Sequence, residues 1–156
     1  MGKDKKENSS NSFSSFLKKR APIYLGLLGL FAIFVVPIFT EKTLDNSLPS
    51  FDGEQQQAVD LLKSYKGANE RGMTVIQVIS DQIAGKYTDE NIYENEKTRI
   101  GLFVSDENQP IYKITLNFES YNGKLEYIWN VNLDSSEIEA ISTDAKEISN
   151  IVDYYD

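Results

Sequence analysis

The chain has 156 residues, a formal net charge of -8, and neither cysteine nor histidine. The missing residue types exclude disulfides, thiol nucleophiles, Ser-His and Cys-His catalytic pairs and ordinary zinc sites within this chain. The acidic excess also disfavours nucleic acid, because binding to its phosphates needs Lys and Arg side chains.

The N-terminal part contains a long apolar segment. Residues 21–39 (APIYLGLLGLFAIFVVPIF) carry no charged side chain. As a helix, this segment is about 28 Å long, close to the roughly 30 Å hydrocarbon core of a bilayer. We therefore predict a transmembrane helix, held in the lipid bilayer by side chains such as Ala21, Leu25, Leu28, Phe31, Phe34 and Phe39. A cleaved signal peptide is the rival interpretation, but the segment is long for one and no A-x-A-like site follows it.

The distribution of charge predicts the orientation of this helix. Lys18, Lys19 and Arg20 precede the apolar segment, whereas residues 41–156 carry ten basic against twenty-two acidic side chains. Because positively charged flanks stay in the cytoplasm, we expect a single-pass protein of the cell membrane with residues 41–156 outside.

Two segments without apolar periodicity flank the predicted span. Residues 1–20 are polar and basic, which predicts a disordered cytoplasmic tail. Residues 40–52 are predicted to be a polar linker to an outer domain at residues 53–156.

Two amphipathic helices are expected at the start of the outer domain. Asp52 and Thr74 are each followed three residues later by a glutamine, which is a capping-box pattern. Apolar residues then recur at helical spacing, and Gly67 and Gly85 are expected to end the two helices.

A β-hairpin is expected next. Asn122 and Gly123 are the preferred pair for a two-residue type I′ turn, and this loop would pair Tyr121 with Lys124. The resulting register gives an apolar face with the opposed pairs Phe118 and Tyr127, Leu116 and Trp129, Ile114 and Val131, and Tyr112 and Leu133.

Flanking elements complete the predicted fold. Strands are expected at residues 99–105 and 137–142, with turns at 105–109 and 134–136, and a last helix from Thr143. The predicted class is α+β: an N-terminal transmembrane helix, then two helices, a four-stranded antiparallel meander and a C-terminal helix.

Four clusters of side chains are candidate sites: two acidic loops, one pair of glutamates and one aromatic set. Acidic loops suit Ca²⁺ but lack the spacing of a calcium loop, so we interpret them as solvated loops; their residues are Asp89, Glu90, Glu94, Glu96, Asp106, Glu107 and Asn108. Glu119 and Glu126 would face each other as in a glycosidase, but on an exposed face opposed carboxylates mainly repel. The aromatic residues Tyr112, Phe118, Tyr127 and Trp129 are expected in the core rather than in a ligand groove.

These interpretations predict no enzyme, and no catalytic, cofactor-binding or metal-ligating residue. The terminal Tyr154 and Tyr155 are expected to extend past the last helix as a surface for a partner.

The stretch from about residue 74 to residue 142 resembles a PepSY-type domain, a small extracytoplasmic α+β module. Tyr112, Ile114 and Leu116 match its Tyr-x-Val-x-Val strand, and the matches to the next strand are Val131, Ser135 and Ile138. Asn132 and Ser136 depart from the family, which has Asp and Gly at these two positions.

The resemblance implies a function in binding rather than in catalysis, because PepSY modules bind or inhibit peptidases or other envelope proteins. We therefore expect a membrane-anchored extracytoplasmic binding or regulatory module that acts on an envelope peptidase or another membrane protein. The alternative is a structural accessory subunit of a multisubunit membrane complex.

Overall fold

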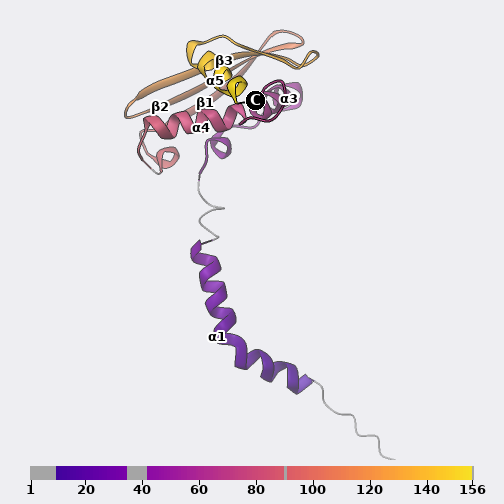
Figure 1. The fold of residues 1–156 in the computed structure, drawn as a ribbon, viewed down its shortest axis with the longest axis vertical. Helices are drawn as coiled ribbons and strands as arrows, with labels where there is room; N and C mark the ends of the chain where they lie inside the picture. Colours follow the sequence, from indigo (N-terminus) through magenta and orange to yellow (C-terminus); the bar gives the residue numbers. More distant parts are fainter. Residues whose placement is uncertain (1–9, 35–41, 90, 156) are drawn as a thin grey trace, which may run out of the picture. The chain divides into compact units, whose positions relative to one another are not determined.

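A computed structural model describes residues 10–34, 42–89 and 91–155 of the chain. The chain divides into two compact units, Met1–Glu41 and Lys42–Asp156. The described part of the first unit is one helix, α1 (Ser10–Phe34), which Figure 1 shows in indigo and purple.

Helix α1 begins earlier than the sequence predicts. Residues 10–20, expected to belong to a disordered tail, are helical, and Leu17, Lys18 and Lys19 are good helix formers. Pro22 consequently lies inside the helix, where its missing N–H removes one backbone hydrogen bond. Among the described residues, no helix has the length and apolarity needed to cross a bilayer. The last part of the predicted span, residues 35–39 with Phe39, lies outside the described residues.

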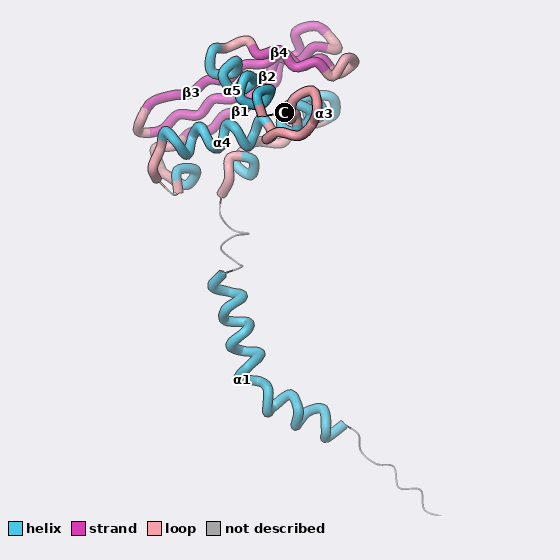
Figure 2. The backbone as a smooth tube through the Cα atoms, viewed as in Figure 1, coloured by secondary structure: helices cyan, strands magenta, loops and turns pink. Residues whose placement is uncertain are grey.

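The second unit is an α+β domain, as the sequence predicts, with one four-stranded antiparallel sheet in the order β1-β2-β3-β4. Figure 2 shows its helices over one face of this sheet. The elements in chain order are the 3₁₀ helix η1 (Asp45–Ser47), α3 (Gly53–Ser64), α4 (Val75–Lys86), the 3₁₀ helix η2 (Ile92–Glu94), β1 (Arg99–Asn108), β2 (Ile111–Ser120), β3 (Gly123–Asn132), β4 (Glu137–Ala140) and α5 (Thr143–Tyr154).

The start of α4 is predicted correctly and its end is not. Thr74 Oγ1 accepts the Gln77 N–H at 3.3 Å, and the Gln77 side chain accepts the Thr74 N–H at 2.9 Å, which completes the capping box. Gly85 does not end the helix, because Tyr87 is buried and its N–H still bonds to the Ile83 carbonyl. At the start of α3, by contrast, Asp52 makes no side-chain capping bond.

The hairpin between β2 and β3 has a different register from the predicted one. Ser120 pairs with Gly123, so the loop is Tyr121 and Asn122 rather than Asn122 and Gly123. A type I′ turn needs positive φ at both central residues, but here only Gly123 has it, with φ of +107°. The shift is two residues, so every side chain keeps its predicted face, but its partner changes: Trp129 lies opposite Ile114.

The strands flanking the hairpin also differ from the predicted ones in length. Strand β1 continues through the predicted turn to Asn108, and the chain reverses at Gln109 and Pro110 instead. Strand β4 ends at Ala140, two residues earlier than predicted.

One face of the sheet, together with the helices, forms the core. Helices α3 and α5 both contact β3, and α4 contacts both of these helices. The buried strand residues alternate along the chain, as the sequence predicts; on the two central strands the apolar ones are Tyr112, Ile114, Leu116, Phe118, Leu125, Tyr127, Trp129 and Val131.

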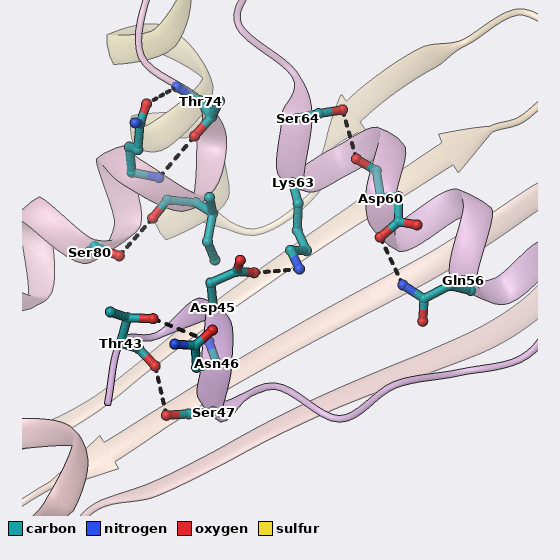
Figure 3. A network of polar contacts seen from close by, with 12 residues as sticks. Thr43, Asp45, Asn46, Ser47, Gln56, Asp60, Lys63, Ser64, Thr74 and Ser80 are labelled. Carbon is teal, nitrogen blue, oxygen red and sulfur yellow. Dashed lines mark hydrogen bonds and ion pairs between the residues drawn. The ribbon is translucent and has the colours of Figure 1, made fainter. Parts of the chain in front are cut away.

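The segment expected to be a linker contributes to this domain. Leu44 has no exposed surface and belongs to the core. Figure 3 shows the contacts that hold the segment: Asp45 forms an ion pair with Lys63 of α3, and the Ser47 hydroxyl donates to the Thr43 carbonyl at 2.7 Å. The compact unit therefore begins at Lys42 rather than at residue 53.

The alternation of burial along β3 predicts different losses of unfolding free energy for substitutions at two neighbouring residues. Trp129 is completely buried, so Trp129→Ala should cost roughly 3 to 5 kcal/mol of unfolding free energy. Asn130 lies on the opposite face and is partly exposed, so Asn130→Ala should change this free energy by about 0.5 kcal/mol or less. Urea unfolding of the chain from Lys42 to Asp156, followed by circular dichroism, measures both values. Equal costs for the two variants would contradict the assignment of the faces.

Candidate functional site

The part of α1 from Ala21 to Ile33 exposes many large apolar side chains. Leu25 and Leu28 are each 67% exposed, and Phe31 is 56% exposed. Ala21 is half-buried, and Phe34 is the last residue of the helix. The exposed side chains lie on every side of α1, since they also include Ile23, Tyr24, Leu27, Leu30 and Ile33. A helix that is apolar all round is normally buried, either in a large protein or in a membrane.

The three predicted topology determinants lie within the same helix. Lys18, Lys19 and Arg20 belong to α1 and immediately precede its apolar part. The helix therefore continues without a break from the polar segment through these basic residues into the apolar segment.

Tyr154 and Tyr155 form an exposed aromatic pair at the end of α5. They are 81% and 61% exposed, and their ring centroids lie 5.0 Å apart with the planes nearly perpendicular. Tyr154 is still helical, so only Tyr155 extends past the helix. The backbone here lies close to the loop before α4, because a Cβ atom built on Gly72 would lie 3.2 Å from the Tyr155 carbonyl oxygen.

The second face of the sheet carries a row of largely apolar side chains that the sequence reasoning missed. Phe103 of β1 pairs with Thr115 of β2, which pairs with Ile128 of β3, and the Ile141 N–H bonds to the Ile128 carbonyl at 2.8 Å. Phe103 is 61% exposed and Ile141 is 39% exposed. The available signal was alternation: Phe103 is out of phase with the buried Leu102 in the same strand.

The two carboxylates weighed as a catalytic pair do not face each other. Glu119 lies opposite Lys124, and Glu126 lies opposite Asn117. Glu126 instead pairs with Lys124, with 3.0 Å between the carboxylate oxygen and Nζ. The expected direct opposition is therefore wrong, because it depended on the incorrect hairpin register.

The aromatic set is confirmed as core. Tyr112, Phe118, Tyr127 and Trp129 each expose 3% or less of their surface. Burial raises the pKa of Tyr127, whose hydroxyl donates to Gln82 Oε1. The pKa of Tyr112 is raised mainly by the hydrogen bond that its hydroxyl donates to Glu54. Between Trp129 and helices α3 and α4 the structure leaves a cavity of about 20 Å³, far smaller than a ligand pocket of roughly 300 to 1,000 Å³.

The first acidic loop is organised by hydrogen bonds. Asp89 accepts the Asn91 N–H at 3.0 Å and the Asn95 side-chain amide at 2.9 Å, and these bonds lower the pKa of Asp89. Glu90 lies outside the described residues. In the part of the chain that the structure describes, no three carboxylates are grouped closely enough to hold a metal ion.

A recess of about 470 Å³ lies where α3 and the loop after it approach the turn between β3 and β4. Glu70 and Ser136 line it, and both have positive φ, at 60° and 56°. Its wall offers hydroxyls, one ammonium and one carboxylate but no nucleophile paired with a base; the lining residues are Leu61, Ser64, Tyr65, Lys66, Gly67, Glu70 and Ser136.

Comparison of the chain with protein-family models, curated proteins and solved structures found no match.

The buried Tyr127 hydroxyl predicts alkaline sensitivity. An unfolded tyrosine ionises near pH 10, whereas folded Tyr127 keeps its proton to higher pH. Its contribution to stability is thus fully present below about pH 10 and is lost as the pH rises toward the raised pKa, by roughly 1 kcal/mol at pH 11. Urea unfolding at pH 7 and pH 11 should show a smaller alkaline loss for Tyr127→Phe than for the unchanged chain.

A matched control is Ile148→Val, because Ile148 is equally buried in the core and carries no ionisable group. This variant should lose as much stability at pH 11 as the unchanged chain. An alkaline loss that is identical in all three proteins would contradict the assignment to Tyr127.

Proposed function

We propose that the chain is a single-pass membrane protein whose α+β unit is an extracytoplasmic binding module. The observation that carries the proposal is the exposed apolar surface around α1, together with the uncharged segment at residues 21–39. A bilayer would cover the apolar surface on all sides of the helix. As a helix, the uncharged segment would also be about as long as the hydrocarbon core is thick.

Charge supports the orientation of the anchor. Lys18, Lys19 and Arg20 precede the apolar part of α1, and the first twenty residues carry six basic against two acidic side chains. Under the positive-inside rule, this end stays in the cytoplasm and the acidic unit from Lys42 lies outside the membrane.

Binding, rather than catalysis, suits the outer unit. The chain contains no histidine or cysteine, and Glu119 and Glu126 are not opposed. A helix leading into an antiparallel meander fits the proposed likeness to PepSY-type modules. The partner class we propose is an envelope peptidase or another membrane protein, which would contact exposed groups such as Tyr154 and Tyr155.

A second candidate function is that of an accessory subunit in a membrane complex. Gly26 and Gly29 favour it, because a Cβ atom built on either would meet nothing within 4 Å. Small residues let another helix approach closely in a membrane, so α1 itself would then be the docking element.

Protease access tests the anchor and its orientation. Protease added to spheroplasts that carry the full chain should digest residues 42–156 and spare a tag at Met1, because only the outer unit is accessible. Detergent should expose the tag as the control. Protection of the acidic unit before detergent is added would overturn the orientation, and release of the full chain into the soluble fraction would overturn the anchor.

Site-specific photo-crosslinking separates the two candidate functions. A photoreactive residue at Tyr154 should capture a partner if the outer unit is the binding module, whereas one at Leu28 should do so if α1 docks into a complex. Asn150 is exposed on the same helix as Tyr154 and serves as the control position. Capture from Leu28 alone, with none from Tyr154, would favour the accessory subunit.

A further inference from the structure

The two edges of the sheet differ in how they are protected. Strand β4 has four residues, two of which are the exposed Glu137 and Glu139. Strand β1 has ten residues, and the stretch from Ile100 to Ser105 carries no charge. Natural edge strands are normally kept short or interrupted by charge and proline, so β1 is the edge suited to pairing with another strand.

The outer backbone groups of β1 have no backbone partner among the described residues. The hydrogen bond between Ile141 and Ile128 shows that even-numbered residues of β3 bond to β4. Odd-numbered residues of β3 then bond to β2, and the register makes their partners the even-numbered residues of β2. Odd-numbered residues of β2 therefore bond to odd-numbered residues of β1, so the even-numbered residues of β1 point outward. On β1 the outward N–H and C=O groups are those of Ile100, Leu102, Val104 and Asp106.

Charged residues stand only at the two ends of β1. Arg99 is exposed at the start, and Glu107 is exposed at the end, where a bulge leaves it out of the backbone pairing of β1 with β2. The ion pair of Glu107 with Lys113, at 3.7 Å, places Glu107 on the face that carries Phe103, and alternation along β1 places Arg99 on the same face. A strand with opposite charges at its ends is complementary to an antiparallel copy of itself.

We propose that two copies of this chain pair antiparallel through β1, with a two-fold axis at Phe103, and so form one continuous eight-stranded sheet. Phe103 then lies opposite Phe103 of the second copy, and Arg99 lies opposite its Glu107. On the other face, Leu102 meets Val104 of the second copy. Each interface is isologous, so the ion pair occurs twice.

Geometry and charge together select this register. Opposed residues must share a face and the outward groups must meet, so the two-fold axis must pass through a residue rather than between two residues. An axis at Leu102 would place Arg99 opposite Ser105 and lose both ion pairs, and an in-register parallel pairing would place like charges together. With the axis at Phe103, one opposed pair combines an apolar with a charged side chain: Ile100 lies opposite Asp106 of the second copy.

Phe103 is suited to the centre of such an interface. It is 61% exposed on the face that the helices leave open. Its ring lies over Gly101, where a Cβ atom would be 3.0 Å from Phe103 Cε2. The ring therefore lies along its own strand and leaves the outer edge accessible to a second backbone.

Single cysteines test the pairing in the full chain, which has no cysteine of its own. At the two-fold axis the Cα atoms would be about 4.5 Å apart, within disulfide range. Phe103→Cys, in full-length protein purified in mild detergent and oxidised with copper phenanthroline, should therefore form a disulfide-linked dimer. Ser105→Cys lies on the same strand and face but about 13 Å from its counterpart, so it should remain monomeric. Equal crosslinking of both variants, or none from Phe103→Cys, would overturn the proposal.

Charge reversal tests the register itself. In the Phe103→Cys background, Arg99→Glu should lower the yield of crosslinked dimer roughly tenfold, because two attractions become repulsions. Adding Glu107→Arg should restore the yield. A yield that does not respond to Arg99→Glu, or that the second change fails to restore, contradicts the pairing. If β1 instead pairs with an extended segment of another protein, the Phe103→Cys variant will not form a crosslinked dimer. That result would also overturn the proposed self-pairing.

Discussion

The burial of one face of the sheet under three helices is the interaction on which the rest of this structure depends. There is no disulfide, so apolar contact must hold the domain together. Trp129 and Tyr127 lie at the centre, with rings stacked at 5.8 Å, and helices α3 and α5 meet them through β3. Because all three helices use this one face, the opposite face and the β1 edge remain available. The surfaces proposed for binding follow from that asymmetry.

Sequence patterns were sufficient for the order of the α-helices and strands in residues 53–156 and for the core-facing side chains of the two central strands. Period-two alternation fixed the faces of β2 and β3, and the Thr74 capping box fixed the start of α4. The hairpin register was missed because a shift of two residues preserves every face, so the hydrophobic pattern cannot detect it. The backbone conformation of the turn decides the register, and among the residues of this turn only Gly123 adopts positive φ.

The remaining differences arise from contacts between residues that are distant in sequence. Tyr87 donates to the Gly123 carbonyl at 3.0 Å and is buried against Phe118, which extends α4 past the glycine expected to end it. Leu44 enters the core from a segment whose composition is that of a linker. The exposed Phe103 becomes informative only when the packing of the helices is known, because this packing leaves the face that carries Phe103 uncovered.

The two proposed surfaces of the outer unit belong to different layers, which makes them separable. Tyr154 and Tyr155 end a helix on the covered side of the sheet, whereas Phe103 lies on the uncovered side. Substitutions at distant sites that share no contacts usually act additively. Loss of self-pairing through Phe103 should therefore leave binding through the tyrosines intact, and a chain that pairs through β1 still presents two aromatic pairs to a partner. A dimer of this kind would bind a partner bivalently, with an avidity set by the spacing of the two α5 helices.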